Sequence, residues 1–190
     1  MKKILLIGGG GHAKSVIDVI EQEGKFGIAG IVEKFIGESK PVLGYELIGT
    51  DDDLPQLRKH YDYALVTVGQ IESAKLRIKL YTRLKELGFI LPSVISPHAY
   101  VSKHATLGEG TVVMHHALIN AQAKVGNNCI VNSKALIEHD TVIADHCHIS
   151  TGAILNGNVH IASESFVGSG VVTKQGAQLS GFIKAGSIAK

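Results

Sequence analysis

The stretch that decides the fold is VGNNCIVNSKALIEHDTVIADHCHISTGA, residues 125–153. Within it an aliphatic residue recurs at every sixth position, beginning with Val125. The same phase holds from Ile95 to Leu179, and only Thr173 departs from it. The residue two places before each of these positions is mostly small. A period of six fits neither a helix nor a simple strand. It predicts a prism-shaped solenoid with three flat faces, one inward residue in six and a small residue at each corner.

Three hexapeptides make one coil of such a prism, so residues eighteen apart should stack at about 4.8 Å. Fifteen hexapeptides in phase then give about five coils without a protruding loop. Cys129 and Cys147 are eighteen apart, and we expect two reduced thiols packed as small hydrophobic groups. His98 and His116 should stack in the same way. We expect no metal there, because no third ligand accompanies the pair.

Composition indicates an ordinary globular protein of 190 residues, with 45% apolar and 19% charged residues. A net charge of +2 without any Lys/Arg run argues against nucleic-acid or membrane partners. The apolar run Ile4–Ile7 is too short for a signal peptide, and nothing approaches the ~18 apolar residues of a membrane span. We therefore expect a cytoplasmic location.

The N-terminal half alternates apolar strands with helical patterns, which predicts a small Rossmann-like α/β domain over residues 1–94. The solenoid should then occupy residues 95–190. The expected strands are Lys2–Gly8, Gly27–Phe35, Tyr45–Ile48 and Tyr63–Val68, and the expected helices are Ala13–Glu23, Leu54–His60 and Ile71–Leu87.

A glycine-rich turn follows the first expected strand. Gly8, Gly10 and Ala13 give G-x-G-x-x-A, and Glu33 stands where an acidic residue would hold a ribose hydroxyl. Open parallel sheets bind ligands at the carboxyl ends of their strands. The residues that we expect to bind substrate at this rim are Gly8, Gly10, Gly11, His12, Glu33 and Gly69. The motif leaves NAD, a nucleotide-linked substrate and a purely structural turn open, and His12 could donate to a phosphate or simply cap the helix.

The candidate for chemistry is His139, which lies between Glu138 and Asp140 and should point outward from the solenoid. A carboxylate can hold an imidazole in one tautomer and stabilise its protonated form, as a general base near neutral pH requires. Spacing alone also allows a surface histidine among charged neighbours.

A family resemblance rests on three features of the sequence. They are the hexapeptide repeats, the GGGGHAK turn at 8–14 and the stretch that follows Asn132. The chain resembles the hexapeptide-repeat sugar acetyltransferases, which include the sialic-acid O-acetyltransferases and the UDP-4-amino-sugar N-acetyltransferases of the bacillosamine pathway. This resemblance covers nearly the whole chain and implies a left-handed parallel β-helix. The matching positions are Asn132, His139, Asp140, His148, Gly152, Gly157 and Asn158.

The resemblance also implies an activity in bacterial surface-glycan biosynthesis. Acetyl-CoA would lie between neighbouring solenoids of a homotrimer, and the N-terminal domain would hold a nucleotide-activated amino sugar. His139 would act as general base and Asp140 would orient it, while Asn132 and His148 would line the acetyl site. The expected cofactor-binding residues are Gly152, Gly157 and Asn158, with backbone N–H groups near Gly157 facing the thioester oxygen or the pantetheine amides. No acyl-enzyme and no metal are expected.

Two departures from the family pattern concern substrate binding. Glu33 and Lys34 stand where relatives often have adjacent aspartates, and the tail Gly186–Lys190 lacks the usual proline. The alternatives are a sialic-acid O-acetyltransferase and a non-catalytic solenoid that assembles or regulates other proteins. An NAD-linked oxidoreductase is disfavoured because no second catalytic constellation accompanies the turn.

Overall fold

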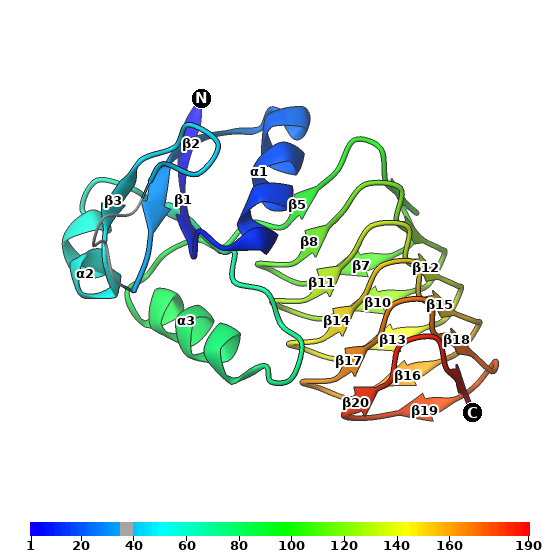
Figure 1. Ribbon diagram of the computed structural model, residues 1–190. Coiled ribbons are helices and arrows are strands. Elements are labelled where there is room, and N and C mark those ends of the chain that lie inside the picture. Colours follow the sequence, from blue (N-terminus) through cyan, green and yellow to red (C-terminus); the bar gives the residue numbers. More distant parts are fainter. Residues whose placement is uncertain (35–39) are drawn as a thin grey trace. The chain divides into compact units, whose positions relative to one another are not determined.

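The computed structural model describes residues 1–34 and 40–190 (Figure 1). Two compact units form, and each is described by itself. An α/β unit contains residues 1–69 and 75–92, and a solenoid unit contains residues 70–74 and 93–190. The last residue of the expected strand Gly27–Phe35 lies outside the described residues.

The α/β unit is built on a four-stranded parallel sheet with strand order β3-β2-β1-β4. Its elements are β1 (Lys2–Ile7), α1 (Gly11–Glu23), β2 (Phe26–Val32), β3 (Leu47–Gly49), the 3₁₀ helix η1 (Asp51–Asp53), α2 (Leu54–Leu57), β4 (Tyr63–Val66) and α3 (Lys75–Glu86). This arrangement confirms the Rossmann-like prediction.

Alternation along β1 sends apolar side chains to both faces of this sheet. Leu5 and Ile7 join a buried cluster with Leu80 and Leu84 of α3. Ile4 and Leu6 point the other way and are equally buried, while α1 covers that face with an apolar stripe that includes Val16 (Figure 1). The two helices thus leave the carboxyl ends of the strands uncovered.

Helix α3 begins at Lys75, so the prediction that it begins at Ile71 is wrong. Gln70–Ala74 instead belong to the solenoid unit. Gln70 is 3% exposed, and its Nε2 donates to the backbone oxygen of His146 at 3.0 Å. This tertiary contact outweighs the helical periodicity of the segment.

The solenoid has three parallel sheets of six, six and five strands. The first sheet contains β5 (Val94–Ile95), β8 (Val112–Val113), β11 (Ile130–Val131), β14 (His148–Ile149), β17 (Phe166–Val167) and β20 (Phe182–Ile183). The second contains β6 (Tyr100–Val101), β9 (Leu118–Ile119), β12 (Leu136–Ile137), β15 (Ile154–Leu155), β18 (Val172–Thr173) and β21 (Ile188–Ala189). The third contains β7 (Thr106–Leu107), β10 (Lys124–Val125), β13 (Val142–Ile143), β16 (His160–Ile161) and β19 (Gln178–Leu179).

The coils form a left-handed parallel β-helix, as expected. The second residue of each strand points inward, and these side chains and the small corner residues make one continuous core. In most of these corners one residue has a positive φ, so that the conformation recurs every six residues, for example at Lys134 (60°) and Asp140 (61°). That left-handed conformation turns the chain sharply from one face to the next.

The six-residue phase slips once, near the end of the described chain. β20 follows β19 after only Ser180 and Gly181, whereas the other corners contain four residues. Gly181 has a φ of 72°, which makes this tight corner possible. The solenoid therefore continues past Leu179, the last position that the period identified, and β21 pairs with β18.

Polar side chains at core positions are hydrogen bonded to the backbone. Thr173, the exception in the aliphatic series, is 2% exposed, and its hydroxyl accepts the Asn156 N–H at 2.9 Å. Cys129 and Cys147 are buried reduced thiols, as predicted, and the Cys147 N–H lies 3.4 Å from the sulfur of Cys129. A hydrogen bond from Cys129 lowers the pKa of the Cys147 thiol.

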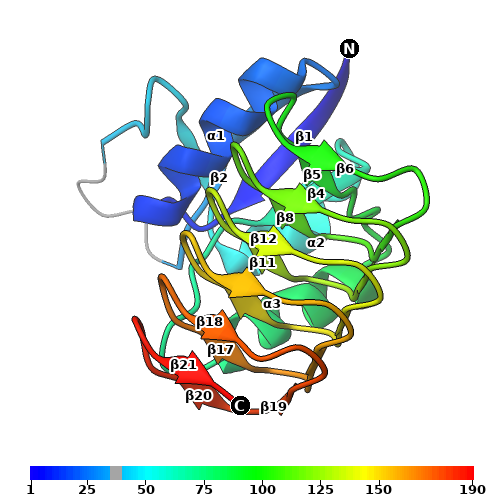
Figure 2. The ribbon, with the colours of Figure 1, turned by 90° about the vertical axis from the view of Figure 1, so that its right-hand side faces the viewer.

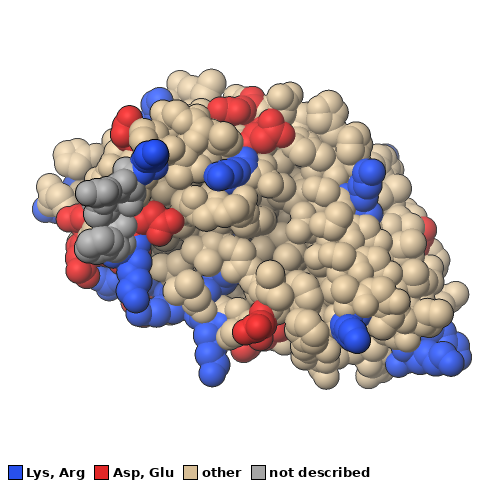
Figure 3. Space-filling view, viewed as in Figure 1, with Lys and Arg blue, Asp and Glu red and all other residues tan. Residues whose placement is uncertain are grey.

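The outward side chains of the second sheet are all apolar and are half-buried or exposed. We call this column the apolar ladder: Tyr100, Leu118, Leu136, Ile154, Val172 and Ile188. Its strands are stacked toward the viewer in Figure 2. The third sheet is more polar and presents Thr106, Lys124, Val142, His160 and Gln178. Charged side chains are also sparse on the solenoid face seen in Figure 3.

Among the residues that the structure describes, no helix is both long and apolar enough to cross a membrane.

Candidate functional site

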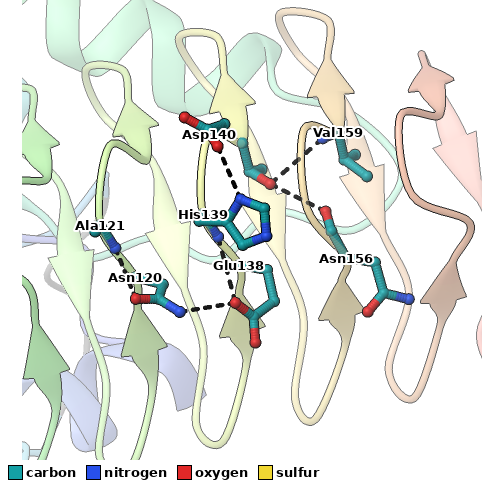
Figure 4. A network of polar contacts seen from close by, with 8 residues as sticks. Asn120, Ala121, Glu138, His139, Asp140, Asn156 and Val159 are labelled. Atoms are coloured by element: carbon teal, nitrogen blue, oxygen red, sulfur yellow. Dashed lines mark hydrogen bonds and ion pairs between the residues drawn. The ribbon is translucent and has the colours of Figure 1, made fainter.

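His139 and Asp140 lie at the corner after β12, between the second and third sheets (Figure 4). Asp140 adopts the left-handed conformation, which aspartate tolerates better than most residues. Its Oδ2 lies 2.8 Å from Nδ1 of His139, and the two side chains are 55% and 57% exposed. Since a carboxylate can only accept, Nδ1 carries the proton in the neutral imidazole, and Nε2 then has the lone pair. The pair therefore presents a basic nitrogen at the surface.

Gly157 lies against the imidazole of His139 from the next coil. A Cβ at this position would be 2.8 Å from both Cε1 and Nε2 of the ring, so a side chain here would force the imidazole to move. Asn158 continues the contact, because its N–H donates to the His139 carbonyl at 2.9 Å. Among the described residues no acceptor pairs with the Gly157 N–H. This corner therefore combines an exposed imidazole, a glycine packed tightly against it and a backbone N–H without an acceptor among the described residues.

Glu138 also belongs to the network, although sequence reasoning named it only as a neighbour of His139. Its Oε2 accepts from Nδ2 of Asn120 at 2.7 Å and from the His139 N–H at 3.3 Å (Figure 4). Asn120 was missed, but its spacing of eighteen residues from Glu138 would have placed the two side chains together. The Glu138 carboxylate thus holds the backbone N–H of His139, the candidate base.

Asn132 and His148, the two residues expected to line the acetyl site, are in contact with each other. Nδ2 of Asn132 lies 3.1 Å from Nε2 of His148, and Nδ1 of His148 lies 2.5 Å from the Gln70 carbonyl oxygen. His148 is only 6% exposed, and its ring meets that of Phe166 edge-on. Gln70 carried no signal in the sequence, because it is 78 residues away from His148.

The His139–Asp140 pair and the Asn132–His148 pair lie at different corners of the solenoid. Asn132 precedes β12 and His139 follows it, so the second sheet separates them. A face of five extended residues is on the order of 15 Å wide. Gly152 lies at the Asn132 corner, where its N–H donates to the Ser133 carbonyl at 3.0 Å. Within one chain, the expected acetyl site and the expected base are therefore not brought together.

The glycine turn of the α/β unit is shaped by close contacts. Gly8 has a φ of 106°, and a Cβ there would overlap Val68. The Gly9 N–H donates to Oε1 of Glu33, so this carboxylate faces the turn itself. A Cβ at Gly10 or Gly11 would meet nothing within 4 Å, which leaves the turn open to the outside.

Helix α1 starts at this turn without a side-chain cap and without an acidic residue in its first turn. Its N–H groups and dipole favour an anion at that place. His12 lies in the first turn, and a Cβ at Gly69 would be 3.5 Å from its Cβ. The expected rim residues therefore surround one helix N-terminus.

A crevice of about 160 Å³ opens at the carboxyl ends of β1 and β2. Its lining includes Gly8, Glu33, Lys34 and Val68. A neighbouring groove of about 460 Å³ shares Asp51, Lys79 and Leu80 with it, and five of the eight residues that line it are charged. Among the described residues, no group of three His, Cys, Asp or Glu side chains could hold a metal ion.

Residues 3–84 match the family model described as the PglD N-terminal domain. The chain is 32% identical to PerB from Caulobacter crescentus, which was solved with CoA and GDP-perosamine. The TM-score is 0.92, and the match covers 100% of this chain and 89% of PerB. No curated protein sequence matched the chain.

A second solved relative is the acetyltransferase domain of PglB from Neisseria gonorrhoeae in complex with acetyl coenzyme A. It is 32% identical with a TM-score of 0.88, and the match covers 100% of this chain and 93% of that domain. WeeI from Acinetobacter baumannii is 20% identical over 100% of this chain and 94% of its own, with a TM-score of 0.78, and shows the fold alone. The first two matches extend through both units at more than 30% identity, and so the chain belongs to the hexapeptide-repeat sugar acetyltransferases, a family of acyltransferases.

Proposed function

We propose that this protein transfers an acetyl group from acetyl-CoA to the amino group of a nucleotide-activated amino sugar of bacterial surface-glycan biosynthesis. The observation that carries the proposal is the His139–Asp140 pair, whose Nε2 stays basic at the surface beside Gly157. The PerB complex with CoA and GDP-perosamine and the PglB domain complex with acetyl coenzyme A support both cosubstrates. Since acetyl-CoA is a cytoplasmic cosubstrate, we propose a cytoplasmic location as well.

In the proposed reaction, the sugar amine attacks the thioester carbonyl. A C–N bond forms, the C–S bond breaks, and CoA leaves with the sulfur. Nε2 of His139 takes the proton that the nitrogen loses and then returns it to the CoA thiolate. Asp140 accepts from Nδ1–H and stabilises the imidazolium between these two steps. The Gly157 N–H is the candidate donor to the thioester oxygen, and Gly152 and Asn158 are the other candidate contacts of CoA.

A homotrimer would complete this site. The apolar ladder is an unpaired face that runs the height of the solenoid, with Tyr100 59% and Ile188 76% exposed. Such a face favours association with another copy. The ladder is bounded on one edge by the His139 corner and on the other by the Asn132 corner. In a ring of copies, the His139 corner of one copy would meet the Asn132 corner of the next.

The α/β unit would hold the acceptor nucleotide. The N-terminus of α1 is suited to its diphosphate, with Gly10, Gly11 and His12 around it. The crevice beside Gly8 and Glu33 is too small for the whole nucleotide, since ligand pockets usually exceed about 300 Å³. The adjoining charged groove supplies the remaining room.

The activity is tested by thiol release from acetyl-CoA in the presence of GDP- and UDP-linked 4-amino sugars. We expect one of these acceptors to be acetylated, and His139→Ala to lower kcat by about 10²–10⁴-fold. Near-normal turnover in a folded His139→Ala protein would refute the role of the base. No thiol release with any sugar would leave the non-catalytic solenoid as the better account.

A hydroxyl acceptor on sialic acid is the alternative. The open helix N-terminus at the glycine turn favours a nucleotide diphosphate over it. Calorimetry with GDP and UDP separates the two: binding of one nucleotide supports the amine acceptor, and binding of neither favours the hydroxyl acceptor.

A further inference from the structure

The segment Gln70–Ala74 connects β4 to α3 and yet belongs to the solenoid unit. Gln70 anchors it, because its Nε2 donates to the His146 carbonyl and the side chain is almost fully buried. Ile71, the next residue, is 63% exposed. The segment is therefore held at Gln70.

The main-chain carbonyl of Gln70 determines which nitrogen of His148 carries the proton. This oxygen lies 2.5 Å from Nδ1 and can only accept a hydrogen bond. Nδ1 is therefore protonated. In the neutral imidazole, Nε2 is then the acceptor.

The amide of Asn132 satisfies that acceptor in a defined orientation. The Ser133 N–H donates to Oδ1 of Asn132 at 2.8 Å, which identifies the other amide atom as nitrogen. This Nδ2 faces Nε2 of His148 at 3.1 Å. One of its two hydrogens is used there, and the second remains for a ligand.

We propose that Gln70 is a positioning residue that holds His148 as its Nδ1–H tautomer and thereby aims the Asn132 amide at the acetyl group. Gln70 touches neither substrate and acts through two hydrogen bonds. That the Asn132 amide donates to an acetyl group rests on the proposed function, whereas the tautomer of His148 does not depend on it. Gln70 lies in a segment that connects β4 to α3, and its proposed role is to support the acetyl site.

The first test is imidazole ¹⁵N NMR on the unaltered full-length protein, with the His148 signals assigned by their loss in His148→Gln. We expect one Nδ1–H tautomer at His148, with Nε2 in the acceptor range. An Nε2–H tautomer or an even mixture would overturn the proposal. This measurement needs no acetyl transfer, so it stands apart from the activity assays.

The second test replaces Gln70 by Met, which is similar in length but cannot donate to the His146 carbonyl. We expect tautomer mixing at His148 and a roughly tenfold lower kcat/KM for acetyl-CoA, as the loss of one aligned hydrogen bond would give. Gln70→Glu should lose more, because a carboxylate would face a carbonyl oxygen. Ile71→Ala is the matched control and should change neither quantity. Unchanged tautomer and kinetics in both Gln70 variants would refute the role.

Discussion

Replacing Gly157 by Ala tests the proposed base, His139, without changing that residue itself. The added Cβ would stand 2.8 Å from both Cε1 and Nε2 of His139, about 0.7 Å inside the normal carbon contact of 3.5 Å. The imidazole is the exposed end of a side chain, so it can rotate away and the coil need not shift. A displacement of roughly 1 Å at the reacting nitrogen costs about 10²-fold in rate. We therefore expect kcat to fall by about 10–10²-fold with little change in thermal unfolding.

The assay is thiol release from acetyl-CoA at saturating sugar, combined with a double-mutant cycle. If Gly157 acts by leaving room for the imidazole, Gly157→Ala should cost almost nothing in a His139→Ala background. The same loss in both backgrounds, or full activity of Gly157→Ala alone, would show that the packing of this ring does not matter.

Three further predictions follow from the solenoid. Asp140→Asn and Asp140→Gly both remove the carboxylate, and both residues tolerate the left-handed backbone. Each variant should lower kcat by about tenfold or more at an unchanged unfolding temperature. An unchanged kcat in both variants would show that Asp140 has no role in catalysis. Leu136→Glu in the apolar ladder should yield monomers by light scattering, whereas Val142→Glu on the third sheet should not; trimers in both variants would point to another interface. Thr173→Val should destabilise the protein by about 1–3 kcal/mol in urea unfolding, because the partly buried Asn156 N–H loses its acceptor. Unchanged stability would contradict this role of Thr173.

The solenoid could be predicted in detail because its physics is local and repetitive. One inward residue in six, with a small residue two places before it, specifies the corner spacing, and residues eighteen apart pair in register. His98 and His116 do stack, with ring centroids 5.9 Å apart. The period stopped being informative at Gly181, where two residues are missing from a corner and the strands nevertheless continue.

The candidate catalytic corner could be predicted only in part from the sequence. Adjacent residues such as His139 and Asp140 can be proposed as a pair, and the packing of Gly157 against the ring follows from the eighteen-residue stack. The contact between Gln70 and His148 joins distant parts of the chain, so no spacing rule identifies it. For the same reason the helical pattern after Ile71 extended the predicted helix too far. The Glu33 carboxylate also faces the Gly9 N–H, a contact that the fingerprint motif does not specify.

The most direct test of the account is complementation between two inactive variants. His139→Ala and Asn132→Ala chains, co-expressed with different tags and purified as mixed assemblies, each keep one intact corner. If the site forms between copies, about a third of the sites in trimers that contain both variants would combine two intact halves and regain activity. Activity no higher than that of the separate variants would contradict a shared site in which His139 is the base.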